Sequence, residues 1–409
     1  MTEIYRVSDY IADFIAEIGV KNVFLLPGGG SMHLVDSVGK NSNLEVVACL
    51  HEQAAAISAE AYARISENIG VAIVTSGPGA TNAITGVAGA WIESIPMMVI
   101  SGQCKRSDML HDSPLRQKGV QEVDIVKMVK SITKYAVIVE NPDDIRGIME
   151  KAYHFAKAGR AGPVWIDVPL DVQGSPIDPE HLLPWKEKIV DSTKINTLSN
   201  DLILQIQSLM EEAKRPLIIA GHGIRLANAA EEFKDWIEAL GIPVVSTWNA
   251  LDLLPYNHPL YIGRPGVVAL RGPNFAVQNC DLLISIGCRL DNVITAFNPR
   301  GFARVAKKIV VDIDQNEIDK LDMDIAISIT SDAGDFIKSV AGIKSLTCPD
   351  WEEWQSRCND WKNRYSINEG VPFSQTGTIS HYQLVDALSE AIPEHTLIST
   401  GSSGLGVEA

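Results

Sequence analysis

Short apolar runs that end in turn residues alternate with helical patterns along the first 172 residues. The runs are NVFLLPGGG, LEVVACL, VAIVTSGPG, PMMVISGQ and GPVWIDVP, and alanine-rich or amphipathic segments such as residues 54–65 and 80–92 lie between them. Strands separated by helices indicate βαβ units, in which helices cover both faces of a parallel sheet. We therefore predict an α/β protein of consecutive doubly wound parallel sheets, with ligands at the carboxyl ends of the strands.

The rest of the chain predicts further units. Residues 173–198 are polar and interrupted by proline, as is typical of a linker. A second α/β pattern covers residues 199–345, with strand candidates RPLIIAGHG, IPVVSTW, CDLLISIGCRLD and KIVVDID. Residues 346–376 carry Trp351, Trp354 and Trp361 at helical spacing, which predicts a connector helix docked by aromatic side chains.

A third unit begins at residue 377 with the helical pattern SHYQLVDALSEAI and one strand candidate, HTLISTG. A single strand has no sheet to complete. We therefore expect residues 377–409 to be the beginning of an incomplete domain.

Composition excludes several classes of partner. The 409 residues are 46% hydrophobic and 21% charged, as in compact globular domains rather than disordered chains. A net charge of −16, without Lys/Arg clusters, disfavours nucleic acid and anionic membranes. The chain shows neither a signal peptide nor the roughly 20-residue apolar run of a membrane span, so we predict a cytoplasmic protein. The six cysteines lack metal-ligand spacing, so they predict reduced thiols and no metal site in this chain.

Two glycine-rich loops follow strand candidates. The PGGG run at residues 27–30 lets backbone N–H groups approach a ligand closely, although it also suits an ordinary tight turn. TSGPGATNAITG, residues 75–86, opens a helix whose first N–H groups are free for an anion or a polar ring, and a plain strand-to-helix turn is equally compatible. Neither loop fits GxGxxG or GxxxxGK[ST], so neither a dinucleotide fingerprint nor a P-loop is predicted.

His51 and Glu52 stand at the head of an alanine-rich helix. A glutamate in the first turn is also favoured by the helix dipole on an ordinary surface helix. The alanines, however, make this helix apolar around much of its circumference, which predicts a buried helix. Burial disfavours the charged form of a carboxylate, and a protonated glutamic acid can donate a hydrogen bond as a general acid or base must. Glu52 is therefore the leading catalytic candidate, with His51 as a neighbour that shapes the site.

Together these motifs resemble the thiamine diphosphate-dependent enzymes of the acetolactate synthase type. The resemblance covers nearly the whole chain and rests on FLLPGGG, HEQAAAISAEAYAR, VTSGPGATNAITGVAGAW, MMVISGQ, VQEVDIVKMVKSITK, GRAGPVWIDVPLDV, AVQNCDLLISIGCRLD and VVDIDQNEI. It implies a pyrimidine-binding domain at 1–172, a central domain that resembles FAD- or nucleotide-binding domains at 199–345, and the start of a diphosphate-binding domain at 377–409.

The resemblance also implies an activity and its residues. A 2-keto acid, pyruvate in the first instance, would be decarboxylated and its acyl-carbanion unit transferred to a second carbonyl compound. Glu52 would hydrogen-bond the cofactor's pyrimidine N1′, and Gln121 would be the second catalytic residue. The residues implied in cofactor binding are Pro27, Gly28, Gly29, Gly30, Gly77, Pro78, Gly79, Asn82, Gln103, Gly401, Ser402 and Ser403. The FAD candidates are Arg160, Gly221, Gly223, Gly263, Arg289, Asp312 and Asp332.

The implied cofactors are thiamine diphosphate, Mg²⁺ with ligands beyond residue 409, and FAD. The implied assembly is a homodimer or homotetramer with the active site between subunits. The chain departs from the family pattern at Leu26, Val120 and Leu170, where the family carries a lysine and two aromatic residues near the substrate channel.

Those departures leave the acceptor open. Two-carbon transfer from pyruvate to a keto-sugar, in surface polysaccharide biosynthesis, is one alternative, because the changes suit a larger neutral acceptor. The family's GDG signature for Mg²⁺ and diphosphate is absent. A noncatalytic nucleotide-binding or scaffolding fragment is therefore a second alternative, and we expect this chain to be inactive on its own.

Overall fold

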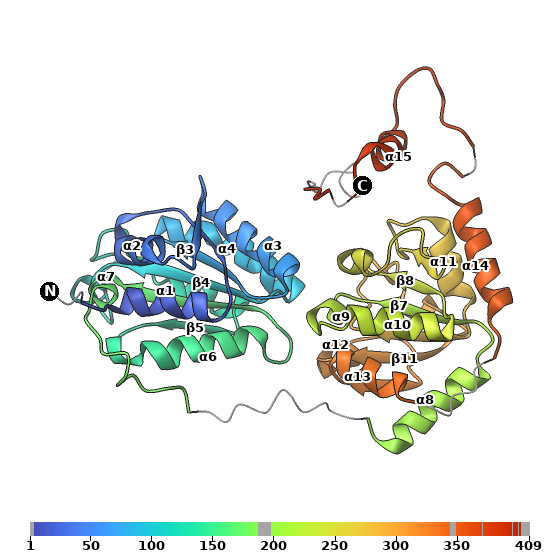
Figure 1. Ribbon diagram of the computed structural model, residues 1–409, viewed down its shortest axis with the longest axis horizontal. Coiled ribbons are helices and arrows are strands. Elements are labelled where there is room, and N and C mark those ends of the chain that lie inside the picture. Colours follow the sequence, from blue (N-terminus) through green and yellow to red (C-terminus); the bar gives the residue numbers. More distant parts are fainter. Residues whose placement is uncertain are drawn as a thin grey trace. The chain divides into compact units, whose positions relative to one another are not determined.

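The computed structural model describes residues 4–186, 198–343, 349–369, 371–394, 396–399 and 401. The chain divides into two compact units, Met1–Lys194 and Ile195–Ala409. Each unit holds a six-stranded parallel sheet with helices on both faces (Figure 1). The predicted α/β fold class is confirmed.

The first unit arranges its strands in the order β2-β1-β3-β4-β6-β5. The strands are β1 (Asn22–Leu25), β2 (Glu45–Ala48), β3 (Gly70–Val74), β4 (Met97–Gln103), β5 (Tyr135–Ile138) and β6 (Pro163–Pro169). Every residue of β3, β4 and β6 is buried, as expected of central parallel strands that are covered on both faces. The chain continues from β1 to β2 on one side and then returns to β3 on the other, so the direction of winding reverses between β1 and β3.

Helices cover the two faces of the first sheet with separate cores. They are α1 (Val7–Glu17), α2 (Met32–Lys40), α3 (Glu52–Ser66), α4 (Pro78–Glu93), α5 (Ile125–Val129), α6 (Ile145–Lys157) and α7 (Leu170–Gln173). Side chains of α1, α2 and α6 join one hydrophobic cluster with the sheet. The alanines of α3 and α4 join the other, together with α5.

The predicted complete burial of the alanine-rich helix is wrong for one face. In α3 the residues Ala55, Ala56, Ala59 and Ala63 are buried against the unit. On the opposite face, 45% of Ile57 and 74% of Ile65 are exposed. The alanine pattern could not show this difference, because a helix that is apolar all round gives no sign of which face meets its own sheet.

The second unit has the strand order β12-β11-β10-β7-β8-β9. Its strands are β7 (Pro216–Ala220), β8 (Val244–Ser246), β9 (Tyr261–Gly263), β10 (Leu282–Ile286), β11 (Lys307–Asp312) and β12 (Ile327–Thr330). Its helices are α8 (Asn200–Glu212), α9 (Gly223–Leu226), α10 (Ala230–Leu240), α11 (Arg271–Asn279), α12 (Gln315–Asp319), α13 (Ala333–Ala341), α14 (Glu352–Arg364) and α15 (His381–Ala391).

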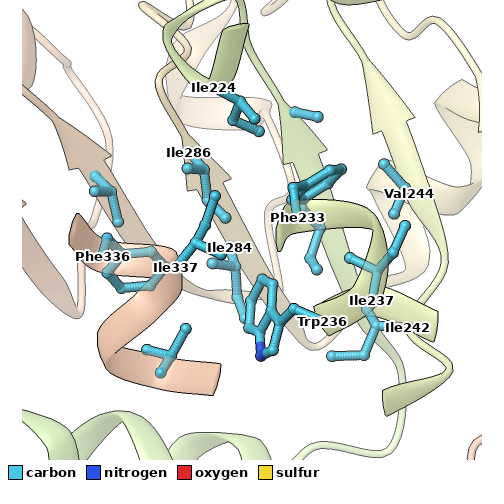
Figure 2. Packing of buried hydrophobic residues seen from close by; sticks show 14 of the residues in the cluster. Ile224, Phe233, Trp236, Ile237, Ile242, Val244, Ile284, Ile286, Phe336 and Ile337 are labelled. Carbon is cyan, nitrogen blue, oxygen red and sulfur yellow. The ribbon is translucent and has the colours of Figure 1, made fainter. Parts of the chain in front are cut away.

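Aromatic and branched side chains fill the core on one face of the second sheet. Figure 2 shows Phe233 and Trp236 of α10 and Phe336 of α13 around Ile284 of β10. The rings of Trp236 and Phe336 meet edge to face, with centroids 6.4 Å apart, a favourable geometry for aromatic pairs.

The predicted connector helix is present as α14, and tryptophans fix it to the second unit. The indole nitrogens of Trp351 and Trp354 donate to the carbonyl oxygens of Ala213 and Pro216, at 2.9 and 2.8 Å. Trp361 packs edge-on against Trp354. The aromatic docking predicted from the spacing is therefore confirmed.

The last helical pattern forms α15, but the strand candidate after it is wrong for the residues described. Residues 396–399 have no strand pairing. A strand is stabilised by hydrogen bonds to a neighbouring strand, and among the described residues this segment pairs with none. No residue of α15 is buried.

Candidate functional site

The glycine-rich loops meet where the winding of the first sheet reverses. The loop of residues 27–30 follows β1 and the loop of residues 75–79 follows β3, and these two strands are neighbours. The N–H of Gly30 donates to Oγ1 of Thr75 at 3.1 Å, and the carbonyl of Gly30 accepts from Nε2 of the buried Gln173 at 2.7 Å. Crevices at such reversals are the usual ligand sites of open parallel sheets.

The glycines of the first loop have different surroundings. A Cβ on Gly28 would lie 2.5 Å from Cβ of Thr75, and one on Gly30 would lie 2.7 Å from Oγ of Ser76. A Cβ on Gly29 would meet no atom within 4 Å. Gly28 and Gly30 therefore allow the two loops to pack together, and Gly29 leaves open space beside its backbone, as a ligand cradle needs.

Glu52 lies beside these loops at the start of α3. Only 7% of its surface is exposed. Its Oε2 accepts a hydrogen bond from Nδ2 of Asn82 in α4, at 3.0 Å. Its Oε1 faces Gly79, where an added Cβ would lie 3.1 Å from that oxygen. The site therefore holds a carboxylate with one oxygen fixed by an amide and the other beside a glycine backbone.

His51 and Pro78 serve the helix starts at this edge. His51 is the N-cap of α3, and its Nδ1 accepts from the N–H of Gln53 at 3.1 Å. Pro78 stands in the first turn of α4, after Gly77 with φ 61°. A proline in the first turn loses no helix hydrogen bond, and a positive φ favours glycine.

Gln121 lies in a long loop against the same edge. Its φ is 57°, and its carbonyl oxygen would lie 2.2 Å from a Cβ added to Gly77. Gly77 therefore has to be glycine both for its own conformation and for the approach of the Gln121 backbone. The residue after it, Glu122, was not anticipated from the sequence.

Gln103, at the end of β4, uses its side-chain amide within the unit. Its Nε2 donates to the carbonyl of Val123 and to Oδ2 of Asp167, each at 3.0 Å, and its Oε1 accepts from the N–H of Cys104 at 3.0 Å. These contacts connect the long loop to the sheet. The sequence signal for Asp167 is a lone acidic residue in the apolar run GPVWIDVP, which we did not interpret as part of the site.

Asp167 is a buried carboxyl held by two donors. Oγ of Ser101 donates to its Oδ1 at 2.5 Å, and Gln103 donates to its Oδ2. Desolvation by burial raises the pKa of Asp167 to about 7, and these hydrogen bonds oppose the rise only in part.

This raised pKa predicts how stability depends on pH. Between about pH 4 and 7 folded Asp167 keeps a proton that the unfolded chain releases, so its contribution to the free energy of unfolding falls by about 1.4 kcal/mol per pH unit as pH rises. We expect Asp167→Asn to remove this decline, as measured by urea unfolding at about pH 5, 6, 7 and 8. Asp171→Asn is the control, because hydrogen bonds from Arg106 outweigh burial there and lower the pKa, which places its titration below this range. If the free energy of unfolding depended on pH in the same way in wild type and Asp167→Asn, the prediction would be contradicted.

The predicted FAD residues of the second unit gather at the carboxyl ends of its strands. Gly221 and Gly223 follow β7 and pack against Gly287 after β10, where the winding of this sheet also reverses. A Cβ on Gly221 would lie 2.0 Å from the Gly287 carbonyl oxygen. The backbone segments therefore touch each other at this point.

The other FAD candidates of the second unit follow further strands of the same sheet, and one candidate lies in the first unit. Gly263 and Asp312 end β9 and β11. Asp332 caps α13, because its side chain accepts hydrogen bonds from the N–H groups of Gly334 and Asp335. Nη2 of Arg289 lies 3.8 Å from Oδ2 of Asp291. Arg160 belongs to the first unit, where its Nε donates to Oγ of Ser94 at 2.9 Å.

The remaining cofactor candidates lie near the end of the chain. Gly401 is exposed, and an added Cβ would meet nothing within 4 Å. Ser402 and Ser403 lie outside the described residues. Within the described ranges, no three His, Cys, Asp or Glu side chains gather as metal ligands would. Across the same ranges, no helix has both the length and the apolar character to cross a membrane.

Comparison with known proteins defines the class. The model for the N-terminal TPP binding domain of thiamine pyrophosphate enzymes matches residues 5–128, and the model for their central domain matches residues 203–340. The chain belongs to the thiamine pyrophosphate enzyme family, whose cofactor is the thiamine diphosphate named above.

Within that family the chain is similar to acetolactate synthase large subunits. It is 36% identical over 347 residues to a probable acetolactate synthase large subunit of Methanocaldococcus jannaschii, which covers 84% of this chain and 57% of the relative. It is 35% identical over 355 residues to the acetolactate synthase large subunit of Corynebacterium glutamicum, covering 86% and 55%. It is 33% identical over 383 residues to the acetolactate synthase isozyme 2 large subunit of Escherichia coli, covering 93% and 66%. The chain thus spans little more than half the length of the first two relatives and about two thirds of the third.

Proposed function

We propose that this chain forms the pyrimidine-binding and central parts of an enzyme that decarboxylates pyruvate and transfers the two-carbon acyl unit to a second 2-keto acid. One observation carries the proposal. The buried carboxylate of Glu52, fixed by Asn82, lies at the reversal of the first sheet beside the glycine-rich loops. The similarity to acetolactate synthase large subunits supports it.

The chain's own residues have defined tasks in this proposal. Bound thiamine diphosphate would supply the electron sink that decarboxylation of a 2-keto acid needs. Glu52 exchanges a proton with a ring nitrogen of the ligand, and its burial keeps water away from that proton. Asn82 orients the carboxylate, and Gly79 lets the ligand-facing oxygen lie close to the backbone. The space at Gly29 admits the ligand's ring, and Gln121 contacts the substrate.

The acceptor is proposed to be a small 2-keto acid. The similarity to acetolactate synthase large subunits favours acetolactate synthesis over transfer to a keto-sugar. We expect the full-length polypeptide, supplied with thiamine diphosphate and Mg²⁺, to form acetolactate from pyruvate and acetohydroxybutyrate when 2-ketobutyrate is added. Product analysis by mass spectrometry tests this. A protein that consumes pyruvate only when a keto-sugar is present would overturn the proposed acceptor.

Mg²⁺ and FAD are proposed as further cofactors. Mg²⁺ would hold the diphosphate. For FAD, the support is that Gly221, Gly223 and Asp312 lie at the carboxyl edge of the second sheet, where nucleotides bind in folds of this kind. Flavin released by heating the purified protein, in a one-to-one ratio, is the expected result, and flavin-free protein with full activity would contradict it.

We propose that the protein is a cytoplasmic homodimer. The exposed apolar face of α3 and α4 supports the dimer. Leu50 is 99% exposed, and Ile57 and Ile65 of α3 and Trp91 and Ile92 of α4 are exposed as well. Exposed apolar patches of this kind mark interaction surfaces. A second copy meeting this face would place both copies of Glu52 near the contact. Sedimentation of the wild type as a dimer, and of Ile65→Asp as a monomer, is the expected outcome.

A further inference from the structure

A single carboxylate holds together the loop that carries Gln121. Residues 104–124 connect β4 to α5, and we call them the Gln121 loop. Both ends of the loop are fixed to the sheet region. Nε of Arg106 pairs with Asp171 at 2.7 Å near its start, and the carbonyl of Val123 accepts from Gln103 near its end.

Glu122 organises the middle of this loop. Its Oε1 accepts from the N–H of Leu110, and its Oε2 accepts from the N–H groups of Lys118 and Gly119, at 3.0 and 2.9 Å. The donors lie 12, 4 and 3 residues before Glu122 in the chain. An ionised carboxylate acts solely as a hydrogen-bond acceptor. Its hydrogen bonds to N–H groups are roughly twice as strong as those between neutral groups. One side chain therefore holds two backbone segments of the loop together, the one at Leu110 and the one at Lys118 and Gly119.

Contacts on the other side of the loop bring it back to its beginning. Nζ of Lys118 donates to the carbonyl of Ser107 at 2.6 Å. A Cβ on Gly119 would lie 2.5 Å from Sγ of Cys104, so the two segments are in close contact. The loop is a compact unit whose centre is the Glu122 carboxylate, as in surface loops that pack on their own side chains.

The charge state of Glu122 agrees with this geometry. Burial alone would raise the pKa of its carboxyl, but the three backbone N–H groups and the nearby Lys118 outweigh burial and lower it. The carboxylate is therefore ionised wherever the protein works near neutral pH, and the three hydrogen bonds persist.

Gln121 directly precedes Glu122, so the carboxylate determines where Gln121 stands. Gln121 has a left-handed backbone conformation, and its carbonyl oxygen packs against Gly77 at the candidate site. We propose that Glu122 is a positioning residue that acts through Gln121: it folds the Gln121 loop so that Gln121 is presented to the substrate. This inference rests on the proposed function for the role of Gln121, whereas the closure of the loop stands on the contacts alone.

The first experiment measures the loop without any catalysis. Glu122→Gln keeps the size of the side chain but turns one acceptor into a donor that faces an N–H group. We expect hydrogen–deuterium exchange of peptides within residues 105–120 to rise about tenfold or more, because these hydrogen bonds no longer restrain local opening. Asp112→Asn, which changes an exposed carboxylate of the same loop, is the matched control and leaves exchange unchanged. Equal exchange in wild type and Glu122→Gln, with both folded by their unfolding midpoints, would overturn the inference.

The second experiment tests the path through Gln121. In the full-length enzyme, we expect Glu122→Gln to raise KM for pyruvate about tenfold with a smaller change in kcat, the pattern of lost substrate binding. The double variant Gln121→Ala/Glu122→Gln should be no worse than Gln121→Ala alone, because residues that act through one another are not additive. Additive losses would show that Glu122 does not act through Gln121. If the wild type lacks pyruvate activity, the proposed function fails, and the exchange experiment still decides whether Glu122 closes the loop.

Discussion

Glu52→Gln is expected to lower kcat with pyruvate by about 10²–10⁴-fold, the range typical of a lost general acid or base. Glutamine keeps an oxygen that can accept from Asn82, whose Nδ2 lies 3.0 Å from the native carboxylate, so the packing is preserved. What disappears is the ability to exchange a proton. The affinity for thiamine diphosphate should therefore change little when measured by calorimetry, and exchange of the cofactor's C2 proton, followed by NMR, should slow greatly.

Glu60 provides the matched control for this experiment. It lies on the same helix and pairs with Arg64 one turn further along, at 2.5 Å, away from the glycine-rich loops. Glu60→Gln should leave kcat within about twofold, since a partly exposed i,i+4 ion pair contributes only a few tenths of a kcal/mol. Unchanged C2 exchange in Glu52→Gln would remove Glu52 from the mechanism.

Gly86→Ala is expected to destabilise the first unit by about 1–3 kcal/mol, the usual cost of forcing an extra methyl into a packed interior. Gly86 lies in α4 where that helix crosses α3. An added Cβ would lie 2.6 Å from Cβ of Ala56 and 2.9 Å from the N of Ile57. The helices must separate to accommodate it. Because Asn82 stands one turn earlier on α4, this separation also draws Asn82 away from Glu52, and activity should fall along with the midpoint of urea unfolding.

Gly89→Ala is the control on the same helix. A Cβ at Gly89 would meet nothing within 4 Å. Alanine is favoured over glycine in a helix by about 0.8–1 kcal/mol, so this variant should be slightly more stable than the wild type. Two variants with the same chemistry and opposite effects would establish that the α3–α4 crossing, and not helix propensity, makes glycine necessary at position 86. Equal midpoints for the two variants would contradict this account.

The central strands could be predicted from the sequence, and three edge strands could not. The apolar runs that became β3, β4, β6, β7, β10 and β11 are nearly continuous because both faces of these strands are covered. The missed strands, β5, β9 and β12, lie at sheet edges and have only three or four residues each. In β12 buried and exposed residues alternate over only four positions, too few to distinguish from a loop.

The candidate site could be predicted in part. The types and order of Pro27, Gly77 and Glu52 point to the strand ends that the structure brings together. The roles of Asp167, Gln173 and Glu122 could not be read from local patterns, because their partners lie far away in sequence or depend on how a loop folds back. Gln173 reaches Gly30 across 143 positions, for example. The resemblance implies that Gln103 contacts the cofactor, and this contact stays a prediction. In the structure the side-chain amide of Gln103 has three hydrogen-bond partners within the unit.

The open space at Gly29 means that folding and binding constrain different glycines of the same short loop. A side chain added at Gly28 or Gly30 collides with Thr75 or Ser76 even without a ligand, so the packing of the fold itself requires glycine at these positions. A Cβ at Gly29 meets no atom of the chain within 4 Å, so a bound ligand or the second copy of the proposed dimer would be what rejects a side chain there. A library of variants at position 29, sorted once for folded protein and once for activity, would therefore show how much room the bound ligand and the second copy leave beside this loop. The residues that pass the first sort but fail the second would mark the limit of that room.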